Sequence, residues 1–153
     1  MTFPKLFITL VALSVFVYSN AKAQSAVLQK GDSLVIQAKA IKRFTHTGIK
    51  VSRGETYQIT ATGRWQDAGF EPTDAGGFPP KNAAMRFAIY LKPMPKENYL
   101  KLVAKVGGRH EPIGTSAKVS FKKSGKLILQ PNDAVFFFGN NSGALTVTIR
   151  RID

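Results

Sequence analysis

Side-chain oxygens gather in one short stretch near the C-terminus, between Asn132 and Gly143. The stretch holds one carboxylate, Asp133, and two adjacent amides, Asn140 and Asn141. Calcium takes about six to eight oxygen ligands from carboxylates, amides and backbone carbonyls. If Asp133 ends one strand and the asparagines begin the return strand, the loop directs these oxygens toward one point. The spacing alone still favours an ordinary hairpin turn, because Asn, Ser and Gly are common turn residues.

Residues suited to catalysis are few. The two histidines, His46 and His110, lie outside any nucleophile or metal-binding motif and are interpreted as surface residues. Asp67, Glu71 and Asp74 cluster in one segment, but intervening glycines and prolines argue against a helix that would align them as a glycosidase pair. They are interpreted as a solvated acidic loop or as contributors to a cation site. Without cysteine there is no thiol catalysis and no zinc–sulfur site, and the sequence predicts a protein that is not an enzyme.

Short runs of alternating apolar and polar residues must position these groups. In the run 55–62, Tyr57, Ile59 and Ala61 share one side and polar residues occupy the other, which is the period of a half-buried strand. No segment shows a sustained helical period. We therefore predict an all-β fold, an antiparallel β-sandwich. The expected strands cover residues 33–38, 55–62, 85–91, 100–106, 127–129, 135–138 and 145–150.

Other segments add detail to this prediction. In the run 100–106, Val103 and Lys105 are expected to point outward from a half-buried strand. Trp65 is interpreted as a core anchor rather than a sugar-stacking platform. The aromatic run 136–138 is interpreted as strand packing. The Gly- and Pro-rich stretch from Trp65 to Asn82 has no periodicity and is expected to be a long loop, which in a compact domain is usually either functional or disordered.

The N-terminus has the layout of a secretory signal. Lys5 precedes an apolar stretch that ends at Tyr18, and Ala21-Lys22-Ala23 forms a small-residue cleavage motif. The stretch is shorter than the roughly 18–20 residues that span a bilayer, so no membrane span is expected. We predict a signal peptide over residues 1–23 and a single β-sandwich domain over residues 24–153. The protein is therefore expected to be secreted or periplasmic.

The chain is strongly basic, with a formal net charge of +13. Such a charge favours anionic partners such as acidic polysaccharide. Nucleic acid is not expected as a partner, because an exported protein rarely meets it. The cations are spread along the chain and are interpreted mainly as solvated strand faces. One hypothesis is therefore a structural or interaction protein of the cell envelope, with a vestigial metal site, that binds acidic polymers through these faces.

The chain resembles the PA-IL (LecA-type) family of bacterial calcium-dependent galactophilic lectins, with the densest match in its last twenty residues. The resemblance rests on Ser124-Gly125 with Leu127, on Asn132-Asp133, and on residues 140–143 before a terminal alternating strand. It covers most of residues 48–149 and implies a galactose-binding-like jelly roll. The further matching pieces, in order, are Gly54-Glu55, residues 62–65 with Gly69, and residues 102–107.

The resemblance also implies a site and a function. Calcium would be held by the side chains of Asp133, Asn140 and Asn141 and by the backbone carbonyls of Phe137 and Ala68. A sugar would lie against Asp133, Ala134, Phe137 and Asn140, and its hydroxyls would complete the calcium shell. The implied partner is a glycan or polysaccharide. The His-Pro-Asp-Gln segment with which the family's lectin contacts galactose has no match in residues 76–81, so the sugar is not implied.

Overall fold

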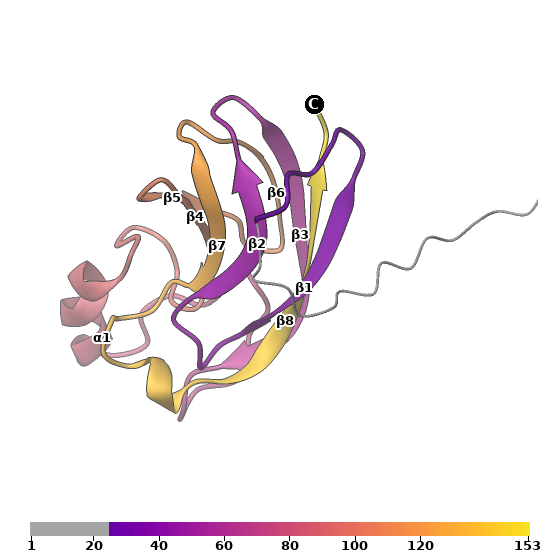
Figure 1. The fold of residues 1–153 in the computed structure, drawn as a ribbon. Helices are drawn as coiled ribbons and strands as arrows, with labels where there is room; N and C mark the ends of the chain where they lie inside the picture. The colour runs from indigo at the N-terminus through magenta and orange to yellow at the C-terminus, as the bar shows by residue number, and fades with distance from the viewer. Residues whose placement is uncertain (1–24) are drawn as a thin grey trace, which may run out of the picture.

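The computed structural model describes residues 25–153, and the predicted signal peptide lies outside the described residues. Two four-stranded sheets face each other, and all pairings between their strands are antiparallel (Figure 1). The first sheet has the order β1-β8-β3-β6 and the second the order β2-β7-β4-β5. This arrangement confirms the predicted β-sandwich. The strands are β1 (Ser33–Lys39), β2 (Thr45–Val51), β3 (Thr56–Gln66), β4 (Leu102–Val106), β5 (Arg109–Pro112), β6 (Ser116–Ser120), β7 (Gly125–Pro131) and β8 (Ser142–Arg151).

The core lies between the sheets and follows the predicted alternation. Tyr57 and Ile59 of β3 are completely buried, and so are Leu145, Val147 and Ile149 of β8. Burying one such aliphatic side chain contributes about 1.5–3 kcal/mol, so the inward residues of these two paired strands supply much of the folding free energy. Hydrophobic burial thus fixes the register of the first sheet, because a one-residue slip would move this whole set to the solvent face.

Trp65 near the end of β3 is 1% exposed, as expected for a core anchor. The expectation for β4 is partly wrong. Val103 is completely buried although it points away from the sandwich interior, so this strand is covered on both faces there. Lys105, on the same outer side, is half-buried.

The predicted strand over residues 85–91 is wrong. These residues form the helix α1 (Ala83–Ala88) and the 3₁₀ turn η1 (Ile89–Leu91), which lie at the end of the sandwich away from the C-terminus (Figure 1). The Asn82 side chain caps α1 by accepting a hydrogen bond from the Met85 backbone N–H at 2.9 Å. The alanines of α1 favour helix, and the segment is too short to show a helical period. No helix within residues 25–153 has the length and apolar character needed to cross a bilayer.

The predicted aromatic strand over residues 135–138 is also wrong. The chain turns at Val135 and Phe136 and enters the 3₁₀ helix η2 (Phe138–Asn140). The Phe137 N–H donates to the Ala134 carbonyl at 2.9 Å and closes this turn. Phe138 is buried, whereas Phe136 is 82% exposed and Phe137 is 54% exposed. The run therefore presents two of its three aromatic rings to solvent.

Candidate functional site

A cavity of about 240 Å³ opens at the end of the sandwich where α1 lies. Three segments meet there: the loop after β3, the turn that links β7 to β8, and α1 itself. The cavity wall includes five of the six residues that the sequence indicated, namely Ala68, Asp133, Ala134, Phe137 and Asn140. The sixth, Asn141, contacts Asp133 directly. The remaining wall residues are Asp67, Phe70, Asn82, Ala84, Met85, Ala88 and Tyr99.

Asp133 is the central carboxylate and is only 2% exposed. Its Oδ1 accepts a hydrogen bond from the Ala134 N–H at 2.7 Å, and its Oδ2 accepts one from Asn141 Nδ2 at 2.8 Å. Burial raises the pKa of Asp133, while these two hydrogen bonds and the charge of Lys92 oppose the rise. The carboxylate is thus held in a fixed orientation, and its charge is incompletely compensated.

Asp67 is a second buried carboxylate in the same wall, and it is 8% exposed. Its Oδ1 accepts a hydrogen bond from Asn140 Nδ2 at 2.8 Å. Burial raises the pKa of Asp67, and the negative charge of Asp133 raises it further. Sequence reasoning placed Asp67 in an acidic loop that contributes at most to a cation site, and it named the neighbouring Ala68 carbonyl as the ligand. The structure brings the Asp67 carboxylate itself to the site.

Asn141 supplies the clearest sign of a missing partner. The side chain is 3% exposed, and its buried Oδ1 has no hydrogen-bond donor among residues 25–153. Leaving a buried acceptor unpaired costs about 1–3 kcal/mol, so native proteins seldom tolerate one without a reason. A cation bound beside Asp133 would satisfy this oxygen.

The donor set fits a hard cation. Within residues 25–153, no three side chains of His, Cys, Asp and Glu cluster as a metal site. The candidate donors are instead two carboxylates, two amides and backbone carbonyls, and oxygen ligands of these kinds are those that calcium prefers. The Phe137 carbonyl also accepts a long hydrogen bond from the Asn140 N–H at 3.4 Å.

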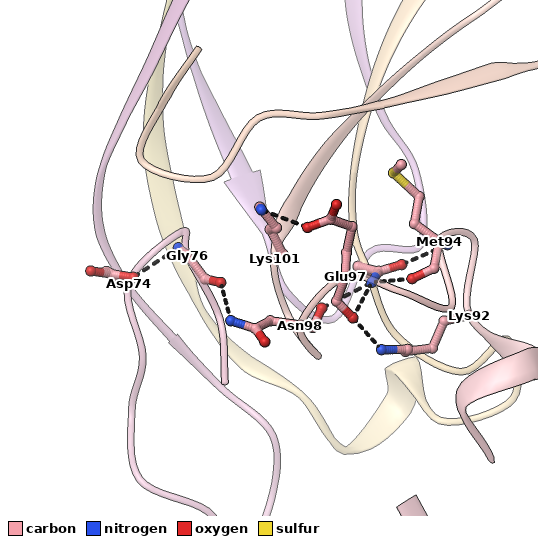
Figure 2. Close-up of polar contacts among 8 residues, drawn as sticks. Asp74, Gly76, Lys92, Met94, Glu97, Asn98 and Lys101 are labelled. Atoms are coloured by element: carbon pink, nitrogen blue, oxygen red, sulfur yellow. Dashed lines mark hydrogen bonds and ion pairs between the residues drawn. The ribbon is translucent and has the colours of Figure 1, made fainter. Parts of the chain in front are cut away.

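Asn132 anchors the segment that precedes Asp133, and it is completely buried. Its Oδ1 accepts from the Met94 N–H at 2.9 Å, and its Nδ2 donates to the carbonyls of Met94 and Asn98, also at 2.9 Å. Figure 2 shows the loop that these bonds hold, including the Lys101–Glu97 ion pair at 2.6 Å. One side chain therefore ties the 94–98 loop to the end of β7 and fixes the position of the backbone just before Asp133.

Lys92 and Tyr99 form a layer behind the site. The Lys92 ammonium donates to the Glu97 carbonyl and lies 4.1 Å from the centroid of the Tyr99 ring (Figure 2 shows the Lys92–Glu97 contact). Burial lowers the pKa of Lys92, and the charge of Asp133 opposes that shift. The Tyr99 hydroxyl donates to the Met85 carbonyl at 2.6 Å and so holds α1 against the cavity.

The other residues considered from the sequence lie away from this cavity. His46 is an exposed residue of β2, and His110 is a half-buried residue of β5. Glu71 and Asp74 are exposed and do not line the cavity, and Asp74 instead accepts a hydrogen bond from the Gly76 N–H at 2.7 Å. Of the three clustered carboxylates, only Asp67 reaches the site.

Comparison with known proteins gives a fold and no family. No family model matches the chain, and no curated protein matches it. Among solved structures, the chain is similar to one described as "EclA N-terminal domain; PllA-like lectin", with a TM-score of 0.61 and 22% sequence identity. The match covers 76% of this chain and 94% of that one. The chain thus has the β-sandwich fold of a PllA-like lectin, and its place in the LecA-type family stays a hypothesis.

Proposed function

We propose that this protein is an exported, non-enzymatic lectin-like module that binds carbohydrate through a calcium ion at Asp67, Asp133, Asn140 and Asn141. The observation that supports it best is the pair of buried carboxylates beside the unpaired Asn141 oxygen. The fold shared with a PllA-like lectin supports the same conclusion. The carbonyls of Ala68 and Phe137 complete the proposed protein ligands.

Electrostatics favours a divalent cation here. Two carboxylates buried in one wall repel each other, and burying an uncompensated charge is costly. A calcium ion between them would neutralise both charges and accept the orphaned amide oxygen. With two carboxylates we expect affinity in the weaker range of extracellular modules, about 10⁻⁴–10⁻³ M in the absence of sugar.

The rest of the cavity suits a sugar ring. When bound, calcium would supply a charged centre that coordinates sugar hydroxyls. Ala84 and Ala88 of α1, together with the half-exposed Phe137, form an apolar wall. Binding sites of this kind combine an apolar lining with a few fixed polar groups, which matches a sugar's apolar C–H face and its hydroxyls.

Thermal unfolding with and without calcium tests the cation. A ligand specific for the folded state adds about 2.7 kcal/mol of stability at one hundred times its dissociation constant. Wild type should therefore melt at a higher temperature in excess calcium, and Asp133→Ala and Asp67→Ala should lose the shift. Glu71→Gln is the matched control, because it removes an exposed carboxylate from the same loop. If wild type shows no shift at millimolar calcium, the proposed metal site is wrong.

A glycan array tests the ligand. The array is probed with wild type in calcium and again in chelator, with Asp133→Ala alongside. We expect signals on a subset of neutral glycans that disappear in chelator and in the variant. Binding that depends on salt but not on calcium would instead support the envelope protein with a vestigial metal site.

A further inference from the structure

A second candidate site lies on the outer face of the second sheet, apart from the carboxylate pair. Residues directly opposite each other in antiparallel strands share a face, and here the register aligns His46, Ile128, Lys105 and His110 in one row across β2, β7, β4 and β5. The two histidines, interpreted from the sequence as surface residues, thus lie at the two ends of one row that includes Lys105.

A cavity of about 120 Å³ opens beside this row. Its wall includes four groups that carry or can carry positive charge, Arg43, Lys92, Lys105 and His110, together with Phe44 and Gln130. The Arg43 guanidinium carbon lies 5.0 Å from the centroid of the Phe44 ring, and Lys105 Nζ lies 5.3 Å from it. Both cations therefore lie against the same aromatic ring.

Arg43 and Lys105 form no ion pair with any acidic residue among residues 25–153. Within residues 25–153 the ion pairs join Lys101 to Glu97 and Arg151 to Glu55, and no carboxylate lines this cavity. Burial lowers the pKa of His110, and the positive charge of Lys105 lowers it further. A bound anion would relieve the repulsion between these groups.

Gln130 shows that the cavity is more than a charged surface. Its side chain is 2% exposed, and within the described part of the chain its buried Oε1 has no hydrogen-bond donor. Sulfate offers no donor to this oxygen, whereas a hydroxyl does. The cavity therefore suits a ligand that carries an oxyanion and a neighbouring hydroxyl, as an acidic sugar does.

We propose that the cavity between Arg43, Lys105, His110 and Gln130 binds the carboxylate or sulfate group of an acidic glycan. The oxyanion pairs with the cations, and an adjacent hydroxyl donates to Gln130 Oε1. Ala134 lines the calcium-site cavity and the next residue, Val135, lines this one, so the two cavities lie on either side of a single chain segment. The proposal needs no calcium and stands independently of the function proposed above.

The test is titration calorimetry in chelator at physiological salt, with a uronic-acid tetrasaccharide, a sulfated tetrasaccharide and a neutral tetrasaccharide. Wild type should bind at least one acidic probe and not the neutral one, and the acidic probe that binds identifies the anionic group. The double variant Arg43→Gln/Lys105→Gln should weaken that binding at least tenfold, as expected for the loss of charged hydrogen bonds, each of which contributes about 1.5–3 kcal/mol. Asp133→Ala should bind the acidic probe like wild type, which separates this site from the calcium site.

Two further variants separate a built site from general attraction. Lys118→Gln/Arg150→Gln removes the same charge from exposed residues that share one row of the first sheet, and it should bind within about threefold of wild type because surface charges contribute little at physiological salt. Gln130→Met leaves the charge unchanged and should still weaken binding severalfold. The proposal would be overturned if neither acidic probe binds, or if duplex DNA of the same charge binds equally tightly. It would also be overturned if both double variants lose binding equally, or if Gln130→Met binds like wild type.

Discussion

Replacing Gly77 by alanine tests how the loop beside the cavity lined by Asp133 and Tyr99 is held. Gly77 has a φ of +69°, and a Cβ placed there would lie 2.0 Å from the Tyr99 carbonyl oxygen and 2.6 Å from the Lys101 nitrogen. Both contacts are with backbone atoms, which cannot rotate away. The neighbouring Phe78 and Tyr99 exchange two backbone hydrogen bonds of 2.9 Å, so the added carbon would push this bridge apart.

The cost has three parts. A left-handed conformation costs a non-glycine residue about 1–2 kcal/mol. Overpacking adds about 1–3 kcal/mol, and each lost backbone hydrogen bond adds about 0.5–1.5 kcal/mol. We expect Gly77→Ala to lower the free energy of unfolding by about 3–8 kcal/mol, a large share of the roughly 5–15 kcal/mol typical of a domain.

Gly69→Ala is the matched control in the same loop. Gly69 has a φ of +84°, but a Cβ added there would meet no atom within 4 Å, so only the backbone cost of about 1–2 kcal/mol remains. Urea unfolding of both variants, followed by tryptophan fluorescence of the buried Trp65, measures the difference. If the two variants lose equal stability, the loop moves to relieve the clash at Gly77, and the Phe78–Tyr99 bridge does not hold the loop in place.

Three further predictions concern pH, the aromatic turn and the Asn132 anchor. Burial raises the pKa of Asp133 and of Asp67 in the folded protein above the ordinary pKa of 3.8. Protonation of each carboxyl therefore favours the folded state. This contribution is complete below pH 3.8 and is lost as the pH rises through the pKa of the folded protein. In thermal melts without calcium, wild type should therefore gain stability relative to Asp133→Asn between neutral pH and about pH 4, and a constant difference would refute this. Phe138→Ala should cost about 3–5 kcal/mol in urea unfolding and Phe136→Ser less than about 0.5, whereas similar costs would restore the strand interpretation. Asn132→Ala should cost about 2–4 kcal/mol and speed hydrogen exchange at residues 94–98, and unchanged exchange there would show that the loop is held elsewhere.

The sheets were predictable because their signal is local. In β3 and β8, burial alternates along much of each strand, and sequence periodicity reads such alternation directly. The helix α1 was missed because six residues are too few to show a period, and its cap depends on the single Asn82 side chain. The aromatic turn was missed because backbone hydrogen bonds decide it, so three hydrophobic rings in a row produced a misleading strand signal.

The site was predictable only in its C-terminal half. Asp133, Asn140 and Asn141 lie within nine residues of sequence, so spacing and family resemblance can bring them together. Asp67 precedes Asp133 by 66 positions, and no local pattern marks it as their partner. It differs from Glu71 and Asp74 only in where the end of β3 places it, and that position depends on the packed sandwich.

The residues of the candidate site come from the ends of strands in both sheets. Asp67 follows β3 of the first sheet, Asp133 follows β7 of the second, and Asn140 and Asn141 lead into β8 of the first. A cation bound to all of them would join the ends of both sheets, and an unfolded chain, with Asp67 far from Asp133 in sequence, would hold it poorly. Binding would therefore stabilise the folded state through the whole sandwich rather than one loop. If the proposed metal site is right, the like-charge repulsion and the unpaired Asn141 oxygen would be the energetic cost of keeping it in place in the metal-free protein.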